Sequence, residues 1–439
     1  MQINLNNIAC SLIILMPALL ITGPFLSDTA VVLIDLIFIY FLFKEKKFEL
    51  INNFTFKILI IFNVYICIRS IFADDILFSL KSSLPYFRFT ILIFAVVFFL
   101  QKNDKLIQYF SIGILITILT LCSDALFQFF FEFNSLGFKV ENPDKINGLF
   151  GDEGVLGSYL IRFLPLFLAC LLTIFRTKNK YLFIISFLYV GFLIFLSGSR
   201  SSIALYILFT FILLFFFSFY RKVILINTLI LLSILTVLLI KYDFSSIDKN
   251  QYYENKLKYK IYYNLINPIK SIFFEKERTE NLQNKKLIIF TRVYHTHYET
   301  AYNMFKENKV FGVGNKMYRR LCNDPKYYVN KYSCTTHPHN FYIQILAENG
   351  IIGFAFISSF FLYLCLQLYK ELYFRIIKKK SNLNNKSLLI FIGIFLNFWP
   401  IIPSGNFYNN WISVLIYFPI AFYIFFKNQQ ESLETSSVK

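Results

Sequence analysis

The sequence predicts an all-α polytopic membrane protein with about 12 transmembrane helices and one large, mainly helical periplasmic loop. Three observations predict this class. First, 56% of the 439 residues are hydrophobic and only 16% are charged, which leaves too little polar surface for a soluble domain of this length. Second, the apolar residues form blocks long enough to cross about 30 Å of hydrocarbon. Third, lysine and arginine are distributed unevenly between alternate connections.

Apolar runs between polar breaks define the expected spans. The first run, from Ile8 to Leu26, lacks the basic start and the small-residue cleavage site of a signal peptide, so we expect a retained helix. The expected spans cover residues 8–26, 27–43, 55–72, 85–100, 106–131, 155–175, 181–197, 202–219, 223–240, 341–369, 387–402 and 410–426.

The distribution of positive charge predicts the side of the membrane that each connection faces. Connections on the side of the two termini contain 19 Lys and Arg residues, whereas the short connections on the opposite side contain 5. Because cytoplasmic loops carry the excess of positive charge, both termini are expected in the cytoplasm, with a cytoplasmic tail at 427–439. The net charge of +18 favours contact with anionic membrane lipids, and no nucleic-acid partner is expected.

Residues 241–340 form the periplasmic loop in this arrangement, between nine spans in residues 1–240 and three in residues 341–426. The loop contains 18 Lys and Arg residues, 9 Asp and Glu residues and all four histidines. Long loops are translocated regardless of charge, so this composition is consistent with the orientation. A connection of this length is usually functional.

Three arginines are expected in the outer half of the membrane. Arg88 and Arg162 lie within spans, and Arg200 lies on the tight outer turn between spans seven and eight. A charge at the bilayer centre costs at least ~2.5–3.5 kcal/mol, so such residues usually face a cavity or a partner. One interpretation is snorkelling or a structural pair with Asp74, Asp124 or Glu132. The other is an anion site, since guanidinium groups bind phosphate oxygens bidentately and would suit a diphosphate at headgroup depth.

The loop is expected to contain an amphipathic helix over residues 288–307. One stripe of that helix carries Arg292, His295, Glu299, Tyr302 and Lys306, and another carries Val293, Ala301, Met304 and Phe305. The sequence GVG at 312–314 predicts a turn. A phosphate-binding role for this turn is rejected, because the strand that a nucleotide-binding fingerprint requires is missing.

Cys322 and Cys334 are expected to form a disulfide. They are the only cysteines of the external loop, and 11 residues separate them. Disulfides are stable outside the cytoplasm. The other five cysteines fall in expected spans, where free thiols behave as small hydrophobic groups.

His337 and His339 lie just before the tenth span. Their spacing could suit a metal, but no Cys, Asp or Glu at ligand spacing accompanies them, which disfavours zinc. An imidazole could instead cap the helix that follows. The favoured interpretation is a general base, because a neutral imidazole near pH 7 can accept a proton from a sugar hydroxyl.

Two motifs in this region resemble a known family. The loop contains N.VFGVGN after a spaced Arg, Ala and Met, and residues 337–354 read HPHNFYIQILAENGIIGF. Together with about 12 helices and a large loop before the tenth, they resemble the O-antigen ligase and O-antigen polymerase superfamily. The resemblance is clearest over residues 285–360, and its most specific element is HN..IQ.L.ENG..G.

The resemblance implies an activity and a set of site residues. Members are inner-membrane glycosyltransferases of bacteria, of the GT-C type, which need no metal or other cofactor. They transfer a glycan from undecaprenyl diphosphate to an acceptor, which is lipid A–core or a second lipid-linked glycan. Arg292 and Arg200 match diphosphate-binding arginines, with Arg162 and Arg88 as further candidates, and His339 matches the catalytic histidine, with His337 beside it.

One segment departs from the family pattern. Relatives often show G.FGNPN before the sixth span, whereas this chain has Asp152 and Glu153 there, followed by Arg162. Two interpretations are open: a different acceptor, or an ion pair with Arg162. For the whole chain, an O-antigen ligase-like inverting transferase is expected. A repeat-unit polymerase is the alternative within the family, and a polysaccharide or lipid transporter or flippase is the alternative from another class.

Overall fold

A computed structural model describes residues 4–140, 145–175, 180–218 and 291–437, with isolated positions between 221 and 266. Within these ranges the structure is helical and contains no strand, only one isolated bridge between Phe133 and Lys139. The α-helices are α1 (Leu5–Leu19), α2 (Pro24–Glu45), α3 (Phe54–Ile71), α4 (Ile76–Ser83), α5 (Phe87–Lys102), α6 (Leu106–Phe131), α7 (Leu156–Ile174), α8 (Lys180–Leu196), α9 (Arg200–Phe216), α13 (Arg292–Glu307), α14 (Tyr318–Leu321), α15 (Phe341–Ile376), α16 (Asn385–Asn397) and α17 (Asn410–Ser437). Short 3-10 turns are η1 (Phe48–Ile51), η2 (Leu84–Tyr86) and η3 (Gly148–Phe150).

The helices agree with most of the expected spans. Seven described helices are long and apolar enough to cross a membrane, and four shorter ones are also apolar. Each of these overlaps one expected span. The remaining span, 223–240, and loop residues 241–290 lie almost entirely outside the described residues. The count of twelve therefore stays a prediction, while the all-helical membrane class is confirmed.

The first expected span is wrong at its end. It was expected to reach Leu26, but α1 ends at Leu19 and α2 already begins at Pro24. Gly23, which precedes α2, has a φ of 108°, a conformation that only glycine adopts readily. Proline is favoured at the first position of a helix. The turn lies inside an apolar stretch, so hydropathy alone does not detect it.

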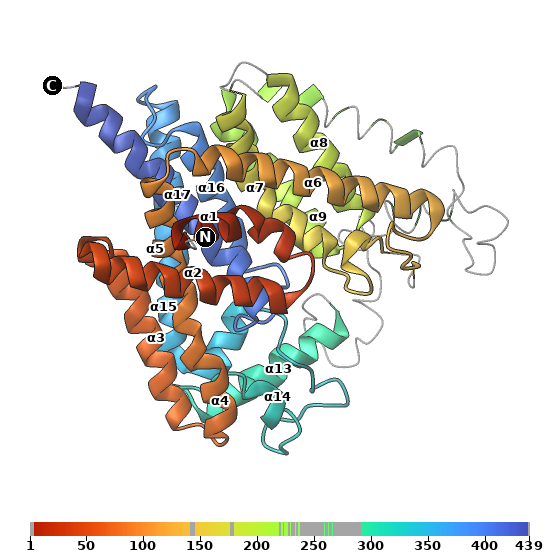
Figure 1. The fold of residues 1–439 in the computed structure, drawn as a ribbon. Coiled ribbons are helices and arrows are strands. Elements are labelled where there is room, and N and C mark those ends of the chain that lie inside the picture. The colour runs from red at the N-terminus through yellow and green to blue at the C-terminus, as the bar shows by residue number, and fades with distance from the viewer. Residues whose placement is uncertain are drawn as a thin grey trace.

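Helix α7 lies at the centre of the bundle. It packs against α6, α8 and α16, and α17 in turn packs against α5 and α16 (Figure 1). A Cβ atom on Gly393 of α16 would come within 2.8 Å of Pro165 of α7. Small residues at helix contacts allow this kind of close approach in membranes. The charged residue Arg162 of α7 is consequently enclosed by other helices.

Helix α13 is amphipathic, as the sequence predicts, but it buries a more polar face than expected. It begins at Arg292, where Thr291 caps it by accepting a hydrogen bond from Tyr294 N. Ala301 and Met304 of the predicted apolar stripe are buried, whereas Val293 is exposed. The other buried residues of the helix are Thr296, His297, Tyr298 and Thr300. In Figure 1, α13 and α14 lie beside the first part of α15.

The predicted turn at 312–314 packs backbone to backbone against residues 347–352 of α15. Its amide groups are engaged in this contact, which agrees with the rejection of a phosphate-binding loop. The hydrogen bonds run from Val313 N to Ala347 O (2.9 Å), from Gly314 N to Glu348 O (2.8 Å) and from Ile351 N to Lys309 O (2.9 Å).

Two glycines permit this contact. Gly312 has a φ of 71°, and a Cβ atom there would lie 2.4 Å from the carbonyl carbon of Glu348. Gly350 has a φ of 63° and interrupts α15; a Cβ atom there would lie 2.2 Å from Val310 O. Both positions require glycine for conformation and for space. The motifs VFGVGN and ENG are thus two halves of one contact.

Helix α3 and a polar network hold this contact from the membrane side. Arg69 of α3 donates to the carbonyl oxygens of Phe311 (2.9 Å) and Gly312 (2.5 Å), and Tyr65 donates to Asn349 O (2.5 Å). Asn349 also donates to the Asn315 side chain (2.6 Å). All these polar groups have partners, which a buried network requires.

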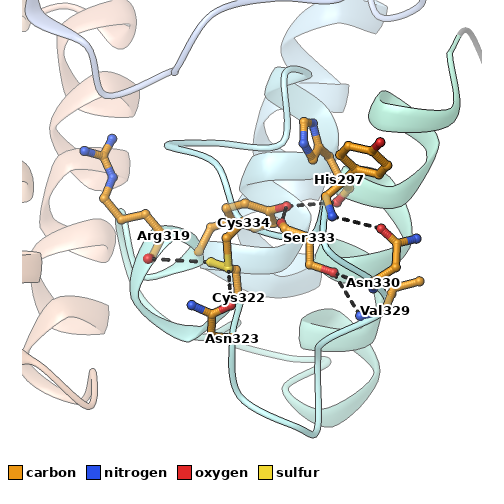
Figure 2. The surroundings of a disulfide bond; sticks show 10 residues. His297, Arg319, Cys322, Asn323, Val329, Asn330, Ser333 and Cys334 are labelled. Atoms are coloured by element: carbon orange, nitrogen blue, oxygen red, sulfur yellow. Dashed lines mark hydrogen bonds between the residues drawn. A yellow bond between two sulfur atoms is a disulfide. The ribbon is translucent and has the colours of Figure 1, made fainter.

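A disulfide joins Cys322 and Cys334 at the far end of the loop (Figure 2). Tyr318 lies next to it and donates to Ser333 O (2.7 Å). Asn330 donates to Thr296 of α13 (3.1 Å), so the segment between the two cysteines is attached to α13. A covalent link around a loop of this size stabilises the folded state by about 3 kcal/mol in the chain-entropy description.

Replacement of Gly350 by alanine should destabilise the protein more than replacement of Gly137. Both glycines have a positive φ, which costs an alanine about 1–2 kcal/mol, but a Cβ atom at Gly137 meets nothing within 4 Å. Gly350→Ala adds the collision with Val310 O. Thermal unfolding of detergent-purified protein, followed by size-exclusion chromatography, should give a lower midpoint for Gly350→Ala than for Gly137→Ala. Equal midpoints would contradict the close contact.

The disulfide should be present in protein isolated from membranes. Non-reducing peptide mapping is expected to recover Cys322 and Cys334 in one linked species, while the other five cysteines, all free in the structure, react with a maleimide after denaturation. Labelling of all seven cysteines without a reductant would exclude the bond.

Candidate active site

Residues 336–340 lead into α15 and are fixed by the segment that follows α16. Asn340 caps α15 by accepting hydrogen bonds from Tyr342 N and Ile343 N, so the alternative that a histidine caps this helix is wrong. The Asn340 side chain also donates to Pro400 O (2.7 Å), and Ser404 N donates to His339 O (2.9 Å).

His339 has an unusual backbone conformation. Its φ is 56°, which costs a residue other than glycine of the order of 1–3 kcal/mol and persists only where the surroundings enforce it. The hydrogen bond from Ser404 and the Asn340 cap enforce it here. The result is a half-buried imidazole held in one position.

Four aromatic side chains surround this point, and we call Tyr294, His297, His337 and His339 the histidine cluster. The ring centroid of His339 lies 4.1 Å from that of His337, 5.4 Å from that of His297 and 5.1 Å from that of Tyr294. Tyr294 and His297 both come from α13. The loop helix and the start of α15 therefore meet at His339.

The sequence did not single out Tyr294 or His297. The prediction assigned the apolar stripe of α13 to the interior and gave these two residues no role. Their spacing of three residues, which places them on one helix face, was the available signal. Their proximity to His339 depends on how α13 packs against α15, and local sequence does not carry that information.

All three histidines of the cluster are held neutral. Burial and the neighbouring His339 lower the pKa of His337 to about 3, and the charge of Arg319 contributes. Burial and His339 lower the pKa of His297 to about 4, and burial lowers the pKa of His339 below its ordinary value. A neutral imidazole keeps a lone pair at neutral pH and can accept a proton.

His337 and His339 differ in accessibility. His337 is buried, and its Nδ1 lies 2.8 Å from the Thr336 hydroxyl. His339 is only partly buried. A pKa near 3 also makes His337 a weak base. Of the two, His339 has the better geometry for contact with a substrate.

Arg200 and Arg292 each begin a helix and are exposed. Burial raises the pKa of Tyr294, and the charge of Arg200 opposes that rise, so Arg200 lies within electrostatic range of the histidine cluster. Arg292 precedes Tyr294 by two residues on α13. Helix α9 thus brings one cation, Arg200, to the border of the cluster at Tyr294, and Arg292 lies on the first turn of α13.

Arg162 and Arg88 have partners within the bundle. Arg162 is buried and donates to Asn397 (2.5 Å) and Ser158 (3.2 Å). Arg88 forms an ion pair with Asp28 (2.8 Å); Asp74, Asp124 and Glu132 were the partners considered from sequence, and Asp28 was missed. Asn397 ends α16, directly before the segment that fixes His339, so Arg162 stabilises that segment from inside the membrane.

Asp152 and Glu153 are exposed in the connection before α7. Among the ion pairs of the described residues, none joins either carboxylate to Arg162, whose side chain is bound to Asn397 and Ser158 instead. Of the two interpretations of this segment, a different acceptor or an ion pair with Arg162, the first is the one to test.

The described residues contain no group of three or more His, Cys, Asp or Glu side chains arranged to hold a metal ion. Two further cations were not predicted, namely Lys316 and Arg319. Both lie in the loop after the GVG turn, and the charge of Arg319 reaches His337. No local motif marks them.

Comparison with known proteins identifies the domain that contains most of these residues. Residues 184–358 match the family model of O-antigen ligase. The match includes both candidate histidines together with Arg200 and Arg292, but not Arg88 or Arg162. No curated protein matches the chain. The apolar helices and the family together indicate a multi-pass protein of the bacterial inner membrane with a glycosyltransferase-like activity. Residues 184–358 thus match an O-antigen ligase domain, and this match supports placing the chain in the O-antigen ligase superfamily.

Proposed function

We propose that this protein transfers a glycan from an undecaprenyl-diphosphate-linked donor to an acceptor hydroxyl at the periplasmic face of the inner membrane. The observation that carries this proposal is a neutral, partly accessible His339 in a cluster that Arg200 borders, with Arg292 on the first turn of the helix that supplies Tyr294 and His297. A base beside cations is the combination that such a transfer requires, because a proton must be removed while an anion departs.

In the proposed reaction the acceptor oxygen attacks the anomeric carbon of the donor. His339 takes the hydroxyl proton, and the bond between the anomeric carbon and the diphosphate oxygen breaks. The electron pair leaves with undecaprenyl diphosphate, so the configuration of the sugar inverts. Arg200 and Arg292 stabilise the negative charge that the leaving group gains. Such a leaving group departs without the help of a metal.

The two arginines inside the bundle receive a different assignment. The sequence proposes Arg162 and Arg88 for the diphosphate as well. Their bonds to Asn397 and Asp28 favour a supporting role toward the donor, because a guanidinium with buried partners has less capacity for a new ligand. We place the donor diphosphate at Arg200 and Arg292.

The orientation is part of the proposal. The excess of Lys and Arg on the side of the termini supports cytoplasmic termini, and residues 241–340 would then be periplasmic. The acceptor, lipid A–core for a ligase or a second lipid-linked glycan for a polymerase, would approach from the same side. A transporter or flippase, the alternative from another class, has less support, because the family match and the histidine cluster both favour a transferase.

His339→Ala and Arg292→Ala should each abolish glycan transfer. The first variant lacks the base and the second lacks a stabilising cation, so a loss of about 10²-fold or more is expected for each. Transfer is measured as the lipopolysaccharide ladder of a deletion strain that expresses each variant. Lys306→Ala is the matched control for Arg292→Ala, since it removes an exposed cation from the other end of α13.

The ladder of the deletion strain also separates the two family reactions. Loss of all long chains on core identifies a ligase, and core with a single repeat identifies a polymerase. Near-normal ladders in both alanine variants, with normal membrane insertion, would refute the assignment.

The rate of transfer should remain high below the ordinary pKa of histidine. Because burial lowers the pKa of His339, the imidazole stays neutral as the pH falls through about 6.5 and becomes protonated only at lower pH. The acid limb of a pH–rate profile in proteoliposomes should therefore have its midpoint below 6.5. Stability measured at each pH is the control, since protonation of His297 and His337 also favours unfolding at low pH. A midpoint above 6.5 would contradict this account.

A further inference from the structure

A second group of cations borders the histidine cluster at His337, whereas Arg200 borders it at Tyr294. This second cation group comprises Arg88, Lys316 and Arg319. The charge of Arg319 acts on His337, and those of Arg319 and Arg88 act on Lys316. Figure 2 shows the Arg319 side chain extending away from the disulfide. Lys316 therefore lies within electrostatic range of both arginines.

Direct contacts explain how residues so distant in sequence come together. Asn315, which precedes Lys316, accepts a hydrogen bond from Asn349 (2.6 Å), and Asn349 in turn accepts one from Tyr408. The ring of Tyr408 lies 5.6 Å from the ring of Tyr86, two residues before Arg88. The loop is thereby fixed against the outer end of α5.

Two buried guanidinium nitrogens of this group have no hydrogen-bond partner among the described residues. They are Nε of Arg88 and Nε of Arg319. Buried polar atoms are almost always bonded in folded proteins, and an exception calls for an explanation. Two exceptions within one group of cations are consistent with a ligand that supplies a missing partner.

The charges indicate the kind of ligand. Asp28 forms an ion pair with Arg88, and Glu348 lies near Lys316 while it accepts hydrogen bonds from Tyr318 N and Gln344. Asp35 is a third carboxylate within electrostatic range of Arg88. Arg319, by contrast, forms no ion pair with a described residue. Burial and the charges of Arg319 and Arg88 lower the pKa of Lys316, as expected where cations repel one another. A negatively charged group would supply the missing partner of Arg319, and a guanidinium binds carboxylate and phosphate oxygens in a fixed geometry.

We propose that Arg319 and Lys316 bind an acidic group of the acceptor glycan, either a carboxylate or a phosphate ester, and thereby hold the acceptor hydroxyl at His339. The inference rests on the proposed function, because it needs a donor at Arg200 and Arg292 and a base at His339. Lys316 and Arg319 belong to the loop and not to a span, which suits contact with a sugar more than with the lipid chain.

Three sugars with the same ring test the binding site. Glucose, glucuronate and glucose 6-phosphate are each titrated into protein purified in a neutral detergent, and the thermal midpoint is measured. The two acidic sugars should raise the midpoint, and glucose should not. The double variant Lys316→Gln/Arg319→Gln should lose the response. Arg320→Gln is the matched control, since it removes the neighbouring cation, which is exposed and lies 3.7 Å from Asp75.

Each outcome decides the inference. A response to only one acidic sugar supports it and identifies the acidic group. An equal response to glucose, no response to any of the sugars, or a double variant that responds like the wild type would overturn it.

A transfer assay separates this inference from the proposed function. With an acidic acceptor, the double variant should raise KM about tenfold or more and change kcat much less. His339→Ala should lose kcat while acidic sugars still bind. If His339→Ala stays active, the proposed function fails and the binding result stands. If His339→Ala is inactive but the double variant keeps its KM, the inference alone fails.

Discussion

The backbone of residues 309–314 lies directly against that of residues 347–352, and this contact holds the loop at the start of α15. It fixes the loop to α15, whose first turn begins directly after His339. It also places α13 so that Tyr294 and His297 reach the same point. The two glycines bring the backbones so close together that no larger residue fits at either position. The histidine cluster is therefore held in one geometry.

Charged residues lie on two sides of the histidine cluster: Arg200 near Tyr294 and Arg319 near His337. The three histidines are neutral mainly because they are buried together. The charge of Arg319 adds to this effect at His337, because a protonated imidazole there would be repelled by it.

The sequence was most informative where one physical requirement dominates. Apolar blocks of sufficient length mark the spans because hydrocarbon tolerates little else, and so eleven helices could be located from hydropathy. Hydropathy did not detect turns within apolar stretches, such as the one at Gly23, because backbone conformation causes these turns. The helix α4 was also missed, since its eight residues fell inside an expected connection.

The site was predictable only in part, for a related reason. Arg200, Arg292 and His339 stand out through charge and through resemblance to a family. The proximity of His297 and Arg319 to His337 depends on tertiary packing between α13, α14 and α15. The ion pair between Arg88 and Asp28 also depends on tertiary packing, because Asp28 lies on α2 and Arg88 on α5.

The facing glycines have a consequence for engineering. Gly312 and Gly350 are 38 residues apart in the chain, yet each lies directly against the backbone around the other. The two segments therefore depend on each other for a close fit. A chimera that exchanges the loop with that of a relative at a boundary between these positions would combine two halves that were not selected together. An exchange of loop sequence between relatives should therefore keep residues 309–352 together as one piece.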